Sequence, residues 1–164
     1  MSRTEFACAA DYFGAVRAAA IDAERIGRRL ERMAAREGVR AQGYEAQGRG
    51  TRSDVNGTDA TVGRMDWEGR IAARREGDYK LIDSACEVIY GNDQTGMGGI
   101  ASLLGSAAAD AVWWRFCGAA QWREVAQRVE MSERWCRDQV AAAMDVCDAY
   151  GMEAMRCGLG VACG

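Results

Sequence analysis

The absence of proline from all 164 residues constrains the fold more than any other feature of this sequence. Proline interrupts helices because it lacks a backbone N–H and its ring clashes with the preceding turn. Alanine, which has the highest helix propensity, is abundant along the whole chain. Nothing therefore prevents long helices, and we expect an all-α fold.

A heptad pattern near the N-terminus predicts a long helix. Its apolar positions alternate steps of four and three residues, at Tyr12, Val16, Ala19, Ala23, Ile26, Leu30 and Met33. A segment rich in glycine and polar residues follows at 38–57. A second helical stretch then carries apolar residues seven apart, at Met65, Ala72, Tyr79 and Cys86. We expect helices over 5–37 and 59–90, closed as an antiparallel hairpin.

The segment YGNDQTGMGG, residues 90–99, marks a boundary between two parts of the chain, because it is rich in turn-forming residues and lacks a helical pattern. We therefore predict a helical hairpin over residues 1–95 and a small helical module over 96–164. Apolar spacing in the module predicts helices over 100–117, 121–129 and 133–150, the first of them either continuous or broken.

The last two of these helices meet at a short turn and form a helix-turn-helix pattern. In the first, the apolar residues recur at helical spacing, at Trp122, Val125, Ala126 and Val129. Ser132 is a natural N-cap for the second, since its hydroxyl can accept a hydrogen bond from a backbone N–H of the first turn. The second helix is expected to bury one stripe, formed by Cys136, Val140, Ala143, Met144 and Cys147.

This stretch, Val112 to Tyr150, resembles region four of sigma factors. The similarity is carried by Arg115-Phe116, Trp122-Arg123-Glu124-Val125-Ala126, Ser132 and the Ala143-Met144 pair. It is closer still to the sigma-like transcription regulators of phages and prophages, which include the ArpU-type late-gene regulators. The chain departs from that pattern at Cys136 and Val140, where larger aliphatic residues are usual, and at Asp138, where a neutral or basic residue is common.

The resemblance implies a DNA-binding transcription regulator whose second helix docks in the major groove of double-stranded DNA. In true sigma factors this module also contacts RNA polymerase. We expect the protein to act with RNA polymerase or as a homodimer, with the hairpin used for one of these contacts. The promoter-melting region of a full sigma factor has no counterpart in this sequence. We therefore expect a regulator or accessory factor.

Helix geometry selects the residues that would face DNA. At roughly 100° per residue, Arg134, Asp138, Ala141 and Asp145 lie nearly opposite the buried stripe. Residues near the start of a recognition helix usually meet base edges, and here these are Glu133, Arg134, Arg137 and Asp138. The arginines suit guanine, and the acids suit cytosine. We assign Arg123 and Arg128, on the preceding helix, to phosphates, and Trp135, which falls off the buried stripe, to a protein contact.

Charge opposes unaided DNA binding by the module. From Ile100 onward there are six arginines against eight acidic residues, whereas contacts to phosphate should dominate affinity. Residues 25–52 carry a local basic excess instead, with eight arginines and three glutamates. This segment is either a solvated helix face or a phosphate-binding arm formed by Arg28, Arg29, Arg32, Arg36 and Arg40.

One residue that enzymes commonly use is missing from the chain. It has no histidine, the commonest general base and zinc ligand, so we expect neither an enzyme nor a metal or cofactor site. Seven cysteines are scattered without a CxxC pair, which fits reduced thiols. No apolar run is long enough for a membrane span and the first residues do not resemble a signal peptide, so a cytoplasmic protein is expected.

Other functions fit the same sequence. A phage-encoded interaction protein could inhibit a host nucleic-acid-binding target, a polymerase or a defence nuclease, through an acidic and aromatic surface, and the net charge of −3 permits this. A small terminase subunit fits less well, since such proteins typically place the helix-turn-helix before the oligomerising helices. The helix pair could also be purely structural, because capped helix pairs occur in any helical bundle.

Overall fold

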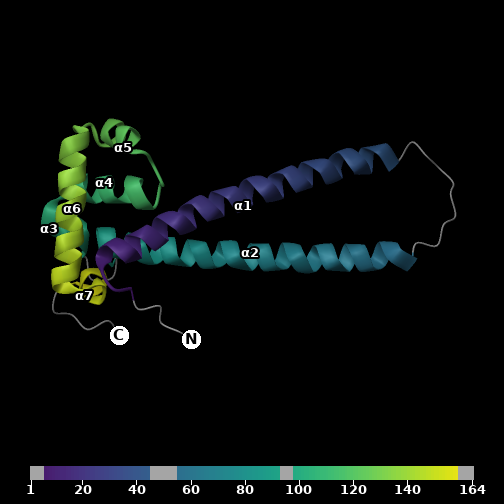
Figure 1. The fold of residues 1–164 in the computed structure, drawn as a ribbon, viewed down its shortest axis with the longest axis horizontal. Coiled ribbons are helices and arrows are strands. Elements are labelled where there is room, and N and C mark those ends of the chain that lie inside the picture. The colour runs from purple at the N-terminus through teal and green to yellow at the C-terminus, as the bar shows by residue number, and fades with distance from the viewer. Residues whose placement is uncertain (1–5, 45–54, 93–97, 159–164) are drawn as a thin grey trace. The chain divides into compact units, whose positions relative to one another are not determined.

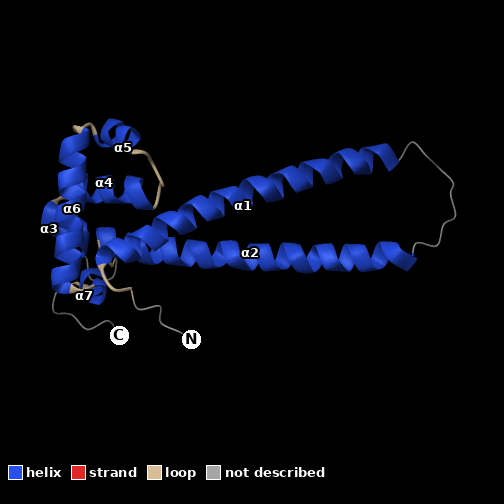
Figure 2. Cartoon of the chain, viewed as in Figure 1, coloured by secondary structure: helices blue, strands red, loops and turns tan. Residues whose placement is uncertain are grey.

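The computed structural model describes residues 6–44, 55–92 and 98–158, and within them all regular structure is helical (Figures 1 and 2). Two long helices come first, α1 over Ala9–Tyr44 and α2 over Val55–Tyr90. The shorter helices follow, and they are α3 Gly99–Leu104, α4 Ser106–Phe116, α5 Trp122–Val129, α6 Glu133–Tyr150 and α7 Met152–Cys157. The predicted all-α fold is confirmed.

Helix ends differ from the prediction where glycines were taken to stop a helix. The first helix continues to Tyr44 and the second begins at Val55, so both enter the glycine-rich segment. Isolated glycines weaken a helix without ending it, and no proline is present to do so. The helix expected over 100–117 is broken at Gly105, whose φ of 91° is accessible to glycine but strained for other residues.

Spatial contacts divide the described residues into two units. Unit 1 combines those of 1–21 with those of 78–164, and unit 2 consists of those of 22–77. This division differs from the expected boundary between residues 95 and 96. The reason is that the first turns of α1 and the last turns of α2 bury their apolar side chains in the same core as the five shorter helices.

The core of unit 1 draws on every part of that unit. Its largest fully buried side chains include Phe13, Val16, Val88, Ile89, Ile100, Val112, Val125, Cys136, Cys147 and Met155. Phe13 meets Phe116 of α4 with ring centroids 5.2 Å apart. The Asp148 carboxylate of α6 accepts a hydrogen bond from the backbone N–H of Ala9 at 2.6 Å, so α6 caps the N-terminus of α1.

In unit 2, α1 and α2 run antiparallel and contact each other through long polar side chains. The Arg74 guanidinium lies 2.7 Å from the Asp22 carboxylate, and Arg64 lies 3.0 Å from Glu37. Because partners nearer the start of α1 pair with residues nearer the end of α2, the predicted antiparallel hairpin is confirmed.

The heptad seam predicted on α1 is also confirmed. Its first five positions are buried and the last two are half-buried, and in order these are Tyr12, Val16, Ala19, Ala23, Ile26, Leu30 and Met33.

The apolar residues seven apart on α2 do not form a buried seam along the helix, although Cys86 at its end is half-buried. Met65 is 65% exposed and Ala72 is exposed, whereas Trp67 and Arg75 are half-buried. A Cβ atom on Gly27 would lie 2.9 Å from the Arg75 Nη2 atom, so this guanidinium packs against α1 where a glycine leaves room. Because Arg75 occupies an inward position, apolar residues alone do not mark the buried face of α2. The spacing of the apolar residues therefore indicated the wrong face.

Two further expectations concern cysteines and membranes. Cys8, Cys86, Cys117, Cys136 and Cys147 are free thiols, as predicted. Cys157 differs from the expectation, because it is disulfide-bonded. Of the described helices, none is both long and apolar enough to cross a membrane.

Candidate nucleic-acid interface

The helix-turn-helix is the centre of the candidate site, and it is built as the sequence predicts. Helices α4, α5 and α6 each pack on the other two. Between α5 and α6, Glu130 adopts a left-handed conformation with a φ of 59°, and Ser132 is the N-cap of α6. The Ser132 hydroxyl accepts a hydrogen bond from the Trp135 backbone N–H at 3.1 Å, which satisfies one of the otherwise unpaired donors of the first turn.

One stripe of α6 faces the core. Four of the five residues predicted for it are buried, namely Cys136, Val140, Ala143 and Cys147, and Met144 is half-buried. Burial raises the pKa of the Cys136 thiol, and burial together with the nearby Asp148 carboxylate raises the pKa of Cys147 to about 12. Both cysteines are therefore protonated packing residues, which leaves the opposite stripe of α6 as the surface available to a ligand.

That opposite stripe carries the residues predicted to meet base edges. The Arg134 side chain is 93% exposed, and its Nε atom lies 4.0 Å from the Asp138 carboxylate. Arg137 similarly lies 3.8 Å from Glu133. Exposed ion pairs one helical turn apart contribute at most about 0.5 kcal/mol, so a stronger partner could displace either acid. In the unbound protein each acid offsets the charge of its neighbouring arginine.

Three arginines converge on the loop between α4 and α5. Arg17 of α1 donates hydrogen bonds from Nη1 to the carbonyl oxygens of Arg115, at 2.6 Å, and Ala120, at 3.2 Å. Arg115 also donates to Ala120, at 3.0 Å. The guanidinium carbons of Arg115 and Arg137 lie 4.5 Å and 4.8 Å from the centroid of the Trp122 ring. We call Arg17, Arg115 and Arg137 the arginine cluster.

The arginine cluster has the electrostatics of an anion site. Burial lowers the pKa of Arg115, and the positive charges of Arg17 and Arg137 lower it further. Among the described residues, Glu133 is the one carboxylate within ion-pair distance of the cluster. The cluster adjoins the N-terminus of α5, where Gln121 makes no side-chain cap. First-turn N–H groups and guanidiniums together favour a phosphate oxygen.

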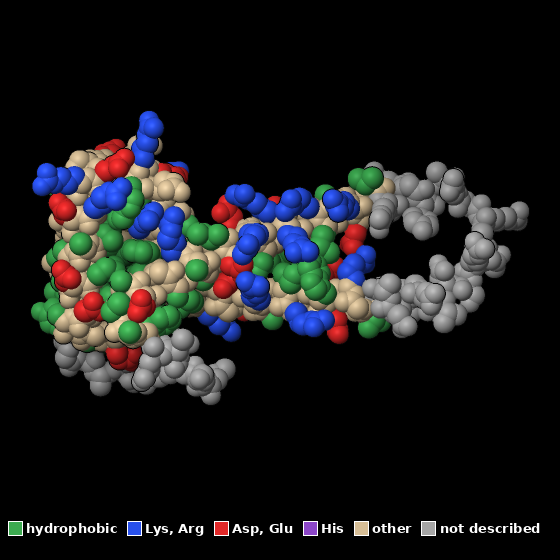
Figure 3. All heavy atoms as spheres, viewed as in Figure 1, with side chains coloured by type: hydrophobic (Ala, Val, Ile, Leu, Met, Phe, Trp, Pro, Cys, Tyr) green, Lys and Arg blue, Asp and Glu red, His purple; other side chains and the backbone are tan. Residues whose placement is uncertain are grey.

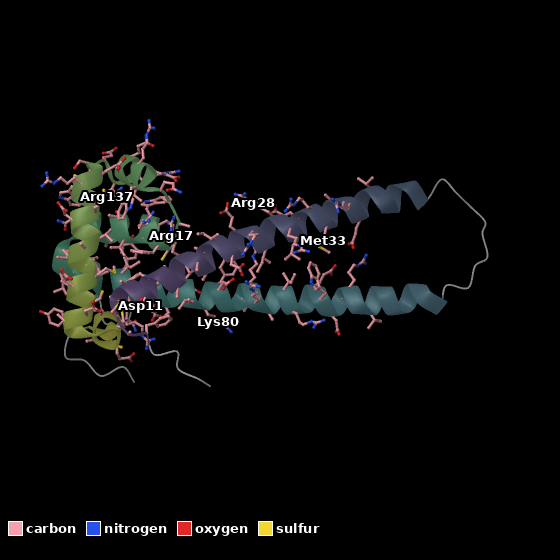
Figure 4. All side chains as sticks on the ribbon, viewed as in Figure 1. Asp11, Arg17, Arg28, Met33, Lys80 and Arg137 are labelled. Atoms are coloured by element: carbon pink, nitrogen blue, oxygen red, sulfur yellow. The ribbon has the colours of Figure 1, made fainter. Side chains whose placement is uncertain are left out.

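Arg17 is a site residue that the sequence analysis missed. It follows Val16 of the heptad seam and lies 98 residues before Arg115 in the sequence. No local pattern links it to the helix-turn-helix, because the link depends on how α1 packs in unit 1. Figure 4 labels Arg17 and Arg137, and Figure 3 shows basic side chains gathered over α5 and the adjoining end of α6.

The two arginines of α5, Arg123 and Arg128, have different surroundings. Arg123 is exposed, as its predicted role requires. Arg128 lies over the Trp114 ring, with its guanidinium carbon 4.7 Å from the centroid, and 3.9 Å from Glu124. Both remain predicted phosphate contacts.

Trp135 is half-buried and packs against the core of unit 1. Part of the ring surface assigned to a protein partner is therefore used within the chain itself.

Four of the five arginines predicted to form a phosphate-binding arm have described side chains, and three of these share one surface. Arg29, Arg32 and Arg36 line one groove of unit 2. Arg28 pairs with Glu24 on the exposed surface of α1, and the side chain of Arg40 lies outside the described residues.

In the described part of the chain, no three acidic or cysteine residues are grouped so that they could hold a metal ion. Comparisons with protein-family models, with curated proteins and with solved structures find no match to this chain.

Proposed function

We propose that this protein is a DNA-binding transcription regulator of the phage and prophage type that reads double-stranded DNA through α5 and α6. The observation that carries the proposal is the arginine cluster at the N-terminus of α5, beside a helix-turn-helix whose second helix is capped by Ser132. Arg17 and Arg115 also hold the loop through its carbonyl oxygens, but three like charges with a single carboxylate nearby repel one another, and a bound anion would relieve that repulsion.

In this proposal α6 enters the major groove with its exposed stripe toward the bases. Arg134 and Arg137 pair with guanine, and Glu133 and Asp138 accept from cytosine amino groups. Ser132 holds the first turn of α6, so that these side chains start from an ordered helix end.

Arg17 and Arg115 of the arginine cluster, together with the first turn of α5, bind a phosphate, and Arg123 and Arg128 bind others. Such contacts set the position of the helix on the duplex without reading its sequence.

The proposal includes a binding partner because acidic residues outnumber basic residues in the module. Counting from Ile100, acids outnumber arginines by eight to six, so the module attracts DNA weakly at a distance. RNA polymerase or a second copy of the chain would raise the local concentration of the module at its site.

The test is selection of bound sequences from random duplex DNA by the full chain, with and without RNA polymerase, followed by salt titration of the selected duplex. The proposal predicts enrichment of a defined sequence and an affinity that falls as salt rises. Absence of any DNA binding at low salt, with and without polymerase, would rule it out. Capture of polymerase or a nuclease together with loss of DNA from that enzyme would favour the inhibitory interaction protein instead.

A further inference from the structure

A second basic surface lies in unit 2, apart from the helix-turn-helix. It is a groove of about 680 Å³ lined by Arg25, Arg29, Arg32, Met33 and Arg36 of α1 and by Trp67 of α2. We call it the arginine groove. Figure 3 shows a row of basic side chains along this part of α1 with hydrophobic atoms beside them, and Figure 4 labels Met33, which extends from α1 toward α2.

The groove arginines form a line along one side of α1. They are spaced by four, three and four residues, so one guanidinium is presented at each helical turn. At 1.5 Å per residue, the line from Arg25 to Arg36 extends about 16 Å. This length suits a ligand with repeated negative charges better than a single small anion.

The charge of the line is largely unneutralised. Arg25 is bound to Asp22 at 2.7 Å. Within the described ranges no carboxylate lies within ion-pair distance of Arg29, Arg32 or Arg36. The Arg29 guanidinium carbon is 4.8 Å from the centroid of the Trp67 ring, and this cation–π contact holds one donor group in place.

We propose that the arginine groove binds the phosphodiester backbone of nucleic acid without reading its sequence. Guanidiniums bind phosphate through paired, parallel hydrogen bonds, and successive phosphates supply the repeated charge that the line fits. An acidic peptide offers the same charge, but it would need apolar anchoring pockets, and the only apolar side chains lining the groove are Met33 and Trp67, the latter covered by Arg29. The inference rests on the proposed function, to which it adds the sequence-independent affinity that the acidic module lacks.

The experiment compares two full-length variants with the same change in charge. The groove variant carries Arg29→Gln, Arg32→Gln and Arg36→Gln. The control variant carries Arg64→Gln, Arg70→Gln and Lys80→Gln, which are exposed residues of α2 and do not line the groove. Binding is titrated with salt on the selected duplex, a random 30-base-pair duplex and a random 30-nucleotide single strand, with poly-glutamate as competitor.

In the groove variant, the slope of log affinity against log salt should fall by about 3 on both duplexes, since each lost phosphate contact removes nearly one unit. The preference for the selected over the random duplex should stay within about twofold of the parent, because phosphate contacts carry no sequence information. The control variant should keep the parent slope within about one unit. Comparison of the single strand with the random duplex shows whether the groove binds single-stranded or double-stranded nucleic acid.

Three outcomes would overturn the inference. Equal slopes for the groove and control variants would show that the groove makes no phosphate contact, while retained sequence preference would leave the proposed function standing. Competition by poly-glutamate as strong as that by DNA of equal charge would assign the groove to an acidic protein. No binding by the parent to any probe would overturn both proposals. Salt-sensitive binding without sequence preference would support the groove and remove the reading role of α6.

Circular dichroism checks that each variant is folded. Should the triple groove variant unfold, Arg36→Gln alone, at an exposed position, must lower the slope by about one unit.

Discussion

Asp138 is the residue that most directly opposes DNA on the outer stripe of α6. Its carboxylate is 70% exposed and lies 4.0 Å from Arg134, so it places a negative charge at the proposed base-reading surface and offsets the arginine beside it. We expect Asp138→Asn to tighten binding to random duplex DNA several-fold at low salt, because it removes repulsion from phosphates. Preference for the selected sequence should fall, since the same carboxylate is proposed to accept from cytosine.

Asp145→Asn is the matched control, because it makes the same charge change on the same helix. Asp145 is exposed and lies seven residues farther along α6, about 10 Å along the axis. It should leave sequence preference unchanged and alter affinity less. Equal effects of the two substitutions on affinity and preference would mean that Asp138 acts only through net charge.

At the scale of the element, the start of α6 depends on a single cap. We expect Ser132→Ala to lower the free energy of unfolding by about 1 kcal/mol, because the Trp135 N–H loses its acceptor. For a chain of this size the melting temperature of unit 1 should fall by roughly 2–4 °C. Ser106→Ala, at an exposed first position of α4, makes the same chemical change and should shift melting by far less.

A melting temperature that Ser132→Ala leaves unchanged would contradict the role of the cap in holding α6. It would also remove one of the two observations from which the helix-turn-helix was inferred.

Local sequence patterns correctly predicted the elements whose structure depends mainly on their own residues. Ser132 and the stripe from Cys136 to Cys147 could be read from neighbouring positions, and α6 begins and ends where expected. The seam of α2 could not, because Arg75 occupies an inward position that only Gly27 of the other helix makes available. Arg17 joined the candidate site only through the packing of α1 in unit 1.

The two units also differ in charge, which no single helix shows. Residues 22–77 contain twelve arginines and ten acids, whereas the rest of the chain contains nine basic and fourteen acidic residues. A division of the chain between residues 95 and 96 does not separate basic from acidic residues in this way. It follows that the arginine groove belongs to the basic unit and the helix-turn-helix to the acidic one.

For the whole molecule we expect stability to fall as pH rises above about 9. Burial raises the pKa of Tyr12 and, with the nearby Asp148 carboxylate, raises that of Cys147 to about 12. Tyr90 is 45% exposed, and its pKa is raised by partial desolvation and by the Asp110 carboxylate, to which its hydroxyl donates at 2.6 Å. The folded state therefore keeps protons that the unfolded state loses at its ordinary values, near 8.5 for cysteine and 10 for tyrosine, so each unit of pH above them favours unfolding.

Cys86 acts in the opposite direction. Cys117, whose own pKa is raised because it keeps its proton, donates a hydrogen bond that lowers the pKa of Cys86. Its contribution is complete above the unfolded value of about 8.5 and is lost as pH falls through the folded value. Denaturant unfolding at a series of pH values should thus show maximal stability between about pH 8 and 9. Tyr90→Phe should flatten the alkaline limb, and a parent curve that stays level to pH 11 would contradict the assignment.

The most direct test of the central claim, that α6 reads DNA, compares the sequences selected from random duplexes by the parent chain, by Arg134→Ala and by Lys80→Ala. Lys80 is an exposed basic residue of α2 far along the chain from the helix-turn-helix. The proposal predicts that Arg134→Ala loses preference at one base-pair position, at a cost of about 1–3 kcal/mol there, and keeps the others, while Lys80→Ala selects the parent sequence. Identical selected sequences for Arg134→Ala and the parent, or no enrichment by the parent, would contradict it.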